Sequence, residues 1–493
     1  MTAVRHPDST TVADPRRWWA LAVLAASLLV VVMDMTILNV ALPEMAAELQ
    51  LTSVSQLWVV DAYALALAGL LIPVTALGDR WGRKRMLMAG YAAFALGSLA
   101  ILWADDAATV IAIRALLGVG GAMVMPSTLS LIRSVFADPR ERTLALSIWG
   151  ATAALGAAVG PVVGGALLES FSWHSAFLVN VPLMVVAIVA AAWLLRENRS
   201  ARPGRIDPVG VVLSAGGMTA FVYAAKELGK HGPGAGTLAL LALGAVMLAA
   251  FARLALTSSR PMLDVRIFAS PVLRAGVVAA LASSAAMVAV LYVGSQWLQL
   301  VEGWTPLRAG LALLPLALGA MVASPFAPAL AERTSPRIVL TGGLVVLALG
   351  LGLLAAVPAT YPWIAAAFTV VGLGTSALGL GSALIMGAAN DDQAGSAAAM
   401  EEITYELGAV LGITFLGSLV GAVYRAGLPA AADVDARESI AGAVGGPWFA
   451  EAADAFVAAF SAVGAVGAVL CALAAVAVWR LVPGDLTLDD AHH

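Results

Sequence analysis

Charged side chains are scarce in this sequence of 493 residues, and their scarcity excludes most classes of protein. Asp, Glu, Lys and Arg make up only 12% of the chain, hydrophobic residues make up 61%, and the mean hydropathy is +0.92. A soluble domain carries about 25% charged residues and would draw the mean hydropathy toward zero. The composition therefore excludes a large soluble enzyme or a disordered scaffold, and it indicates a membrane protein.

Cysteine and histidine are also rare. The single cysteine, Cys471, cannot form an internal disulfide, and its apolar surroundings favour a packing role. The five histidines lie in predicted loops and tails, so we expect neither a metal site nor a membrane enzyme built on one. The only Gly-Lys pair, Gly229-Lys230, lacks the upstream glycine of a phosphate-binding loop, which excludes an ATP-driven pump. A net charge of −4 gives no positive field for nucleic acid, and we expect no nucleic-acid partner and no cofactor.

Long apolar runs dominate the rest of the chain. A helix needs about 20 apolar residues to cross the hydrocarbon core of a bilayer. Cutting the chain at charges, prolines and polar clusters predicts an all-α polytopic membrane protein with fourteen spans. They are 18–40, 56–77, 86–104, 109–132, 144–168, 175–195, 208–225, 236–256, 273–297, 308–330, 338–357, 361–386, 396–424 and 456–479.

Arginine and lysine predict the orientation of these spans, because cytoplasmic loops retain positive charge. With the N-terminus in the cytoplasm, 21 of the 27 basic residues fall on the cytoplasmic side, five fall outside, and Arg114 lies within a span. Lys226 is among the five placed outside. Both termini are therefore predicted to be cytoplasmic, and the longest polar stretch, about 425–455, is predicted to lie outside.

A faint internal repeat suggests two related halves. An acid-Arg pair follows the second span, as Asp79-Arg80, and recurs after the tenth span, as Glu332-Arg333. The repeat predicts a six-helix half at 1–200, an inserted helix pair with its linker at 201–260, and a second six-helix half at 261–493. Two parallel halves with a binding site between them are typical of secondary transporters.

Five motifs carry a resemblance to a known family over nearly the whole chain. They are Met33-Asp34-Met35-Thr36-Ile37-Leu38-Asn39-Val40-Ala41-Leu42-Pro43, Trp58-Val59-Val60-Asp61-Ala62-Tyr63, Gly78-Asp79-Arg80-Trp81-Gly82-Arg83-Lys84, Arg114-Ala115-Leu116-Leu117-Gly118-Val119-Gly120-Gly121, and Gly156 with Gly160-Pro161 and Gly164-Gly165. With these motifs the sequence resembles the major facilitator superfamily, and within it the fourteen-span drug:proton antiporters. Thr75 and Leu117 depart from the family pattern, which usually has glycine and glutamine at these places.

The resemblance implies a monomeric exporter in the bacterial cytoplasmic membrane, with protons as the coupling ion and a lipophilic, cationic small molecule as the substrate. Export of one specific neutral antibiotic is the main alternative. A proton-coupled importer and a transporter-like sensor are weaker alternatives. The glycine and proline signature at 156–165 argues against the importer, and the charges retained inside the spans argue against the sensor.

Asp34, Asp61 and Arg114 are predicted to lie inside three spans, at a similar depth near the outer face. A charge at mid-membrane costs about 2.5–3.5 kcal/mol on insertion scales, so a retained one suggests a function. We expect Asp34 and Asp61 beside Arg114 to carry the coupling proton. The alternative is a static ion pair that only locks the helices together.

Glu401, Glu402 and Glu406 lie in the thirteenth span, and Glu402 and Glu406 share one helical face. These acids, with Tyr405 between them to stack on a cation, are predicted to bind substrate and protons, as the resemblance also implies. The alternative is that Glu401 and Glu402 are hydrated at the cytoplasmic end of the span. Five intramembrane carboxyls against Arg114 alone predict a cavity that attracts cations.

Two further motifs suggest a conformational role. By resemblance, Asp79 and Arg83 latch the two halves together on the cytoplasmic side, and Arg80 and Gly82 belong to the same conformational motif. The basic residues could instead serve orientation alone. The small residues Gly156, Gly160 and Gly164 allow close helix approach, and Pro161 removes one backbone hydrogen bond. Packing alone explains the glycine stripe, and the resemblance adds that the bend of the helix at Pro161 accompanies export rather than uptake.

Overall fold

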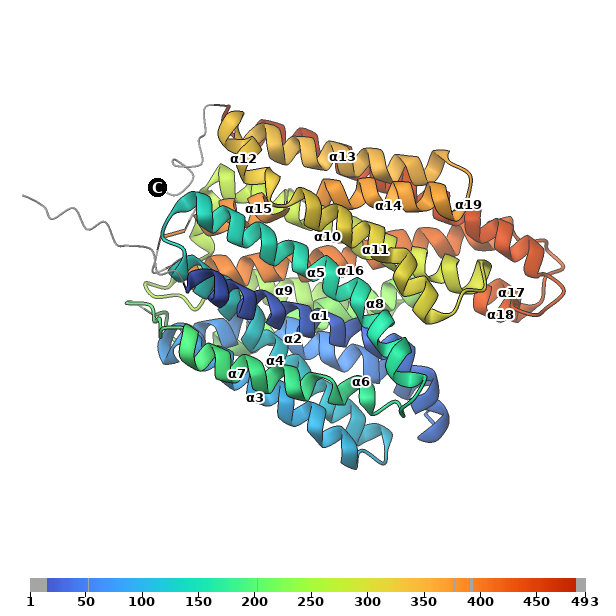
Figure 1. Cartoon of the computed structure of the whole chain (residues 1–493), viewed down its shortest axis with the longest axis horizontal. Helices are drawn as coiled ribbons and strands as arrows, with labels where there is room; N and C mark the ends of the chain where they lie inside the picture. The colour runs from blue at the N-terminus through green and yellow to red at the C-terminus, as the bar shows by residue number, and fades with distance from the viewer. Residues whose placement is uncertain are drawn as a thin grey trace, which may run out of the picture.

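The computed structural model describes residues 16–484 except 52, 202, 376, 377, 388, 391 and 392. Every regular element in this described part is helical (Figure 1). It contains fourteen apolar helical segments long enough to cross a membrane. The predicted all-helical fold with fourteen spans is confirmed.

The first nine α-helices form the first six spans and the inserted pair. They are α1 (Arg17–Glu48), α2 (Ser53–Trp81), α3 (Arg83–Ala100), α4 (Ala107–Val135), α5 (Pro139–Leu168), α6 (Ser175–Leu178), α7 (Asn180–Leu194), α8 (Pro208–His231) and α9 (Ala235–Thr257), with a short 3-10 turn η1 (Ile101–Trp103) after α3.

The remaining helices form the second half. They are η2 (Val265–Ala269), α10 (Pro271–Gln296), the π-helical turn η3 (Trp297–Val301), α11 (Pro306–Ala323), α12 (Phe326–Arg333), α13 (Pro336–Ala356), α14 (Tyr361–Thr375), α15 (Leu378–Gly387), α16 (Ala394–Gly427), α17 (Val434–Glu438), α18 (Ile440–Ala443) and α19 (Phe449–Leu481).

Several helix boundaries differ from the predicted ones. The predicted first span ended at 40, but α1 continues to Glu48. The predicted span at 175–195 is interrupted at Val179, between α6 and α7. The polar stretch predicted at 425–455 is shorter than expected, because α16 extends to Gly427 and α19 begins at Phe449. These differences arise because hydropathy locates only the apolar part of a helix. A helix can continue beyond its apolar part where its polar residues are solvated.

A shared local signal starts five of the helices. In each, an Asp, Ser or Thr side chain accepts a hydrogen bond from a backbone N–H of the first turn, and proline follows as the first helical residue. The pairs are Asp138-Pro139, Asp207-Pro208, Ser270-Pro271, Thr305-Pro306 and Ser335-Pro336. Asp106 caps α4 in the same way without proline, and the hydrogen bonds from Thr109 lower the pKa of its exposed carboxyl.

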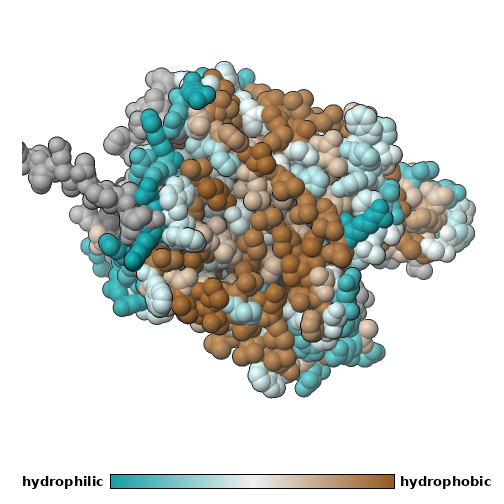
Figure 2. All heavy atoms as spheres, in the orientation of Figure 1, coloured by the Kyte–Doolittle hydropathy of each residue, from teal (hydrophilic) through white to brown (hydrophobic). Residues whose placement is uncertain are grey.

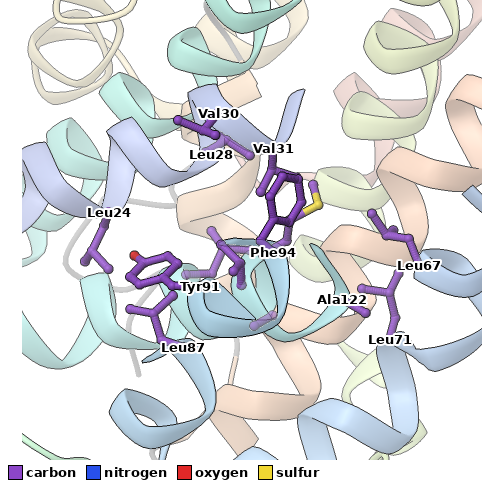
Figure 3. Packing of buried hydrophobic residues seen from close by; sticks show 14 of the residues in the cluster. Leu24, Leu28, Val30, Val31, Leu67, Leu71, Leu87, Tyr91, Phe94 and Ala122 are labelled. Carbon is purple, nitrogen blue, oxygen red and sulfur yellow. The ribbon is translucent and has the colours of Figure 1, made fainter. Parts of the chain in front are cut away.

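The helices pack into two groups that lie on opposite sides of the molecule in Figure 1. In the first group α1 packs against α5 and α7, and α4 packs against α2 and α3. Figure 3 shows Leu24 of α1 next to Tyr91 and Leu87 of α3 in this core. In the second group α13 packs against α14 and α19, and α10 packs against α16. The groups meet where α5 contacts α11 and α15.

Apolar side chains also cover much of the outside of the bundle. Figure 2 shows a hydrophobic band across the middle of the visible face, with hydrophilic residues gathered toward the ends. The exposed side chains include Trp193, Val186 and Leu243. An exposed apolar belt of this extent is stable only against lipid. The chain is therefore a polytopic membrane protein.

Candidate functional site

Asp34 and Arg114 form an ion pair in the interior of the first group of helices. Arg114 Nη1 lies 2.6 Å from Asp34 Oδ2, and the two side chains are 2% and 1% exposed. Asn180 at the start of α7 donates a hydrogen bond of 2.7 Å to the other carboxylate oxygen of Asp34. The structure thus brings together two of the predicted residues and adds Asn180, a polar residue in an apolar segment that the sequence analysis did not select.

Arg114 also contacts α2. Its Nε donates to the carbonyl oxygen of Val59 at 3.1 Å, and its guanidinium lies 4.6 Å from the ring centroid of Tyr63. Val59 and Tyr63 flank Asp61 in the sequence, so the three predicted charged residues lie at one level of the bundle.

Asp61 is paired with a residue that the sequence analysis had placed elsewhere. Lys226 Nζ lies 2.8 Å from Asp61 Oδ1, and the two side chains are 18% and 10% exposed. The prediction that Lys226 lies in an outer loop was wrong, because α8 continues to His231 rather than ending at 225. The expectation of five carboxyls against Arg114 alone was therefore also wrong, since Lys226 supplies a second cation.

Glu401 and Glu402 are fully buried in α16. The alternative in which both are hydrated is therefore wrong, because α15 and the surrounding helices cover this part of α16. Glu401 accepts a hydrogen bond from Ser382 of α15. Neither carboxyl oxygen of Glu402 has a hydrogen-bond partner among the described residues, and the same holds for the second oxygen of Glu401.

Tyr405 and Glu406 are half-buried one turn farther along α16. The Tyr405 hydroxyl is enclosed without a hydrogen-bond partner in the described part of the chain. Glu406 lies within electrostatic range of Glu402, of Lys226 and of Tyr63. Tyr63 is also within range of Asp34 and Arg114. Tyr63 therefore lies near charged residues of both groups of helices.

Asp79 lies at the end of α2, at what we call the Asp79 end of the bundle. Arg83 donates to Asp79 Oδ1 through Nε at 3.1 Å and Nη2 at 2.9 Å, and both side chains are buried. The Asp79 carboxylate also faces Gly395 in the first turn of α16, so closely that a methyl group there would overlap it. A carboxylate is favourable at a helix N-terminus. Asp79 thus contacts both groups of helices.

Gly82 holds the turn between α2 and α3. Its φ of 122° disfavours any residue with a side chain, and a methyl group there would overlap the carboxylate of Glu197. Glu197 accepts hydrogen bonds from the backbone N–H groups of Lys84 and Arg85 at 3.0 and 3.3 Å, which caps α3. Arg80, by contrast, is exposed. Glu197 was not among the predicted residues, because its only signal in the sequence is an acid that follows the sixth span.

Further contacts close the Asp79 end between the two groups. Arg133 of α4 donates to the carbonyl oxygens of Met386 and Ala389, at and beyond the end of α15. Arg140 at the start of α5 pairs with Glu332 of α12 at 3.3 Å. Each contact joins a residue of the first six spans to a residue beyond position 330.

The glycine stripe of α5 lies against α1. A methyl group at Gly156 would lie 2.8 Å from the carbonyl oxygen of Leu29, one at Gly160 would overlap Thr36, and one at Gly164 would lie 2.8 Å from Ile37. Beside Pro161 and Val162, Gly310 of α11 leaves similarly little space. The predicted small-residue stripe therefore packs within the first group, against α1, whereas Gly310 lets α11 of the second group approach α5 beside Pro161.

Comparison with known proteins identifies the family. Residues 24–413 match the Major Facilitator Superfamily. The chain belongs to this superfamily. Two solved structures share its fold. The proton:xylose symporter XylE has a TM-score of 0.63 at 13% identity and covers 97% of this chain and 99% of its own. The human organic anion transporter MFSD10 has a TM-score of 0.60 at 12% identity and covers 93% of this chain and 100% of its own.

Relatives within the superfamily are more similar in sequence. The multidrug efflux pump LfrA of Mycolicibacterium smegmatis is 40% identical over 451 residues, which is 90% of each chain. The methyl viologen resistance protein SmvA of Salmonella typhimurium is 36% identical over 86% of each chain. The puromycin resistance protein of Streptomyces alboniger is 34% identical over 82% of each chain.

The site of this superfamily member offers acid-base chemistry within the membrane. Glu402 is enclosed without a partner, and a carboxyl in that position is stable only with a proton or beside a cation. Asp34 and Asp61 already have such cations in Arg114 and Lys226. Among the described residues, no three His, Cys, Asp or Glu side chains come together in a way that could hold a metal ion. Proton and cation binding are what the arrangement supports.

Proposed function

We propose that this protein is a proton-coupled antiporter that exports lipophilic, cationic drugs across the bacterial cytoplasmic membrane, with no cofactor. Its relatives are named as efflux pumps and resistance proteins over most of their length. Among the side chains that the structure describes, five carboxyls lie inside the spans together with Arg114 and Lys226. Such a set binds positive charge when its acids are ionised and releases it when they are protonated.

The observation that carries the proposal is the environment of Glu402. A buried carboxyl with both oxygens unpartnered is a site in which a proton and an organic cation exclude each other. Tyr405, on the same helix, offers an aromatic surface for such a cation. Exchange at one site is the simplest physical basis for antiport, because protonation of the carboxyl releases the cation.

The proposal includes an orientation and a division of the chain. Since 21 of the 27 basic residues fall on one side, we place the Asp79 end and both termini in the cytoplasm. The halves at 1–200 and 261–493 would move relative to each other as a monomer, with the inserted pair at 201–260 attached. When the cytoplasmic side opens, Asp79 would separate from Gly395, and Arg133 would separate from the end of α15.

Export of one specific antibiotic remains a second candidate. The puromycin resistance protein and the tetracenomycin C resistance and export protein of Streptomyces glaucescens are among the relatives, the latter at 30% identity over 82% of this chain. The Lys226–Asp61 pair also reduces the negative charge of the site. A neutral substrate would leave the carboxyls to proton transfer alone.

Everted membrane vesicles test the proposal directly. We expect vesicles that contain the protein to accumulate ethidium when a proton gradient is generated, and to lose it when an ionophore dissipates the gradient. The variant Asp34→Asn should lower this accumulation to that of vesicles without the protein, because an amide keeps the volume but cannot carry a proton. The matched control is Asp106→Asn, at an exposed helix cap where asparagine serves as well.

Two results would contradict the proposal. If ethidium and a panel of other lipophilic cations show no gradient-dependent movement, the protein is not an exporter of this class. If Asp34→Asn transports like the unmodified protein, Asp34 has no part in coupling, and the static ion pair explains its contact with Arg114.

A further inference from the structure

Lys226 places a positive charge among the acidic residues from an unexpected part of the chain. It belongs to α8, the first helix of the inserted pair, and lies 165 residues from its partner Asp61 in the sequence. Its side chain is 18% exposed, so its ammonium is held by the 2.8 Å contact with Asp61 and largely withdrawn from solvent. A half-buried ion pair of this kind is screened much less than one on the surface.

The position of α8 explains how Lys226 reaches this site. On one side α8 packs against α2, where Tyr223 stacks on Trp58 with ring centroids 5.9 Å apart. On the other side it packs against α16, where Thr414 donates to the carbonyl oxygen of Ala225 at 2.9 Å. The helix therefore bridges a helix of the first half and a helix of the second half.

Two carboxyls near Lys226 come from these same two helices. Asp61 of α2 accepts its hydrogen bond, and Glu406 of α16 lies within its electrostatic range. One ammonium thus faces one acid from each half. When both acids are ionised, Lys226 compensates one of their two negative charges.

We propose that Lys226 determines which substrate charge the protein accepts. Its ammonium acts as a built-in monovalent cation that compensates Asp61 and Glu406, so that the site favours substrates with one positive charge over substrates with two. Without Lys226 the two acids would present one more negative charge and favour a dication. The inference rests on the proposed export of cations and deepens it by assigning charge selectivity to the inserted helix pair.

A purely structural role is the rival explanation. In that case the Lys226–Asp61 pair would only hold α8 against α2, and its loss would impair every substrate equally. Loss of overall activity fits both explanations. Only charge selectivity also predicts a change in the ratio of transport of a doubly charged substrate to transport of a singly charged one. The two explanations also make different predictions for a variant that removes the charges of both Lys226 and Asp61. Such a variant restores the net charge of the site but not the ion pair between α8 and α2.

Ethidium and propidium form a matched pair of probes, because they share an aromatic ring system and carry one and two positive charges respectively. In Lys226→Met we expect the ratio of kcat/KM for propidium to that for ethidium to rise about tenfold or more, since one unit of charge at a partly buried site changes binding at least that much. Lys226→Arg should keep the original ratio. Arg253→Met, which removes an exposed charge from the same helix pair, is the control.

Equilibrium binding to the purified protein in lipid nanodiscs, followed by the fluorescence of the two dyes, provides the second arm. The affinity ratio should shift in Lys226→Met and return to the original value in the double variant Asp61→Asn/Lys226→Met. This arm needs no proton gradient, so it separates a failure of the inference from a failure of the proposed antiport. Three results would each overturn the inference. The affinity ratio of propidium to ethidium could be unchanged in Lys226→Met, the double variant could show the same shifted ratio as the single variant, or neither dye could bind to the unmodified protein.

Discussion

Asp34 and Glu402 are both buried carboxyls, yet their surroundings differ. Asp34 is held by Arg114 on one oxygen and by Asn180 on the other, so a negative charge is compensated in place. Glu402 has no partner on either oxygen within the described residues. In the proposed exchange, Glu402 is the acid that either a proton or a cation can occupy, whereas Asp34 already has a cation beside it.

Two substitutions of Arg114 distinguish the contribution of its positive charge from that of its guanidinium geometry. In Arg114→Ala the Asp34 carboxyl would lose its cation, and breaking a buried pair by removing one partner costs about 3–5 kcal/mol. We expect this variant to lose gradient-driven export and to melt at a lower temperature. Arg114→Lys should recover only part of both, because one ammonium cannot contact Asp34 and the Val59 carbonyl with the geometry of a guanidinium.

Thermal melting in detergent and ethidium accumulation in vesicles measure these effects. Full export by Arg114→Ala would show that the charge serves packing alone. A melting temperature that is unchanged in this variant would show that water or another group reaches Asp34.

Glu406→Gln tests whether the acids of α16 recognise charge. Glutamine keeps the size of the side chain and removes its negative charge, so export of a cation should weaken more than export of a neutral drug of similar size. The effect is measured as the ratio of the two kcat/KM values. Glu451→Gln, at an exposed position of α19, is the matched control. Equal losses for both substrates would assign Glu406 to the proton path and favour the specific-antibiotic alternative.

At the scale of elements, close approach between helices depends on a few glycines. Those of α5 allow contact with α1, and Gly395 allows the start of α16 to meet the carboxylate of Asp79. The first type of contact lies within a half and the second joins the halves. Changes at these positions should therefore affect stability in one case and conformational equilibrium in the other.

Gly395→Ala should weaken closure of the Asp79 end. Its methyl group would overlap the Asp79 carboxylate, whereas Gly342→Ala in α13 places a methyl group where no atom lies within 4 Å. With Ser127→Cys introduced beside Asp79 and Arg83, we expect faster thiol labelling and slower export in Gly395→Ala than in Gly342→Ala. Cys471 is buried and can be replaced by alanine to remove background. Identical labelling rates in the two alanine variants would contradict a latch at this position.

At the scale of the whole molecule, closure involves several dispersed contacts. Arg133 reaches the end of α15, Arg140 pairs with Glu332, and α5 packs against α11 and α15. The Arg140 pair is exposed, and such pairs contribute about 0–1 kcal/mol. Packing of α5 and the buried contacts of Asp79 and Arg133 are therefore the main forces that hold the Asp79 end closed.

The orientation of the molecule is tested by labelling single cysteines from outside the cell. Ala430→Cys, in the loop after α16, should react with a membrane-impermeant maleimide in intact cells. Ser259→Cys, in the loop after α9, should react only after the membrane is permeabilised, because the basic residues near it favour the cytoplasm. Both side chains are exposed, so access is decided by the side of the membrane. The reverse pattern would invert the proposed topology.

The number of spans and the membership of the superfamily followed from the sequence. A span needs about 20 consecutive apolar residues, which is a local property that can be counted. The motifs around Asp34, Asp79 and Gly160 are equally local. The functional roles of these residues remain predictions, because neither the structure nor the comparisons measure transport.

Tertiary structure alone decided how the charges pair. Lys226 meets Asp61 across 165 positions, and Asn180 meets Asp34 across 146. Which partner a buried charge finds depends on how far each helix extends, how it is rotated and what packs against it, and hydropathy carries none of this information. Burial of Glu401 and Glu402 likewise depends on α15, which covers them. The sequence by itself identified Arg114 and the five carboxyls inside the spans but not Lys226, whereas packing decided which of these charges are compensated, because compensation requires contact.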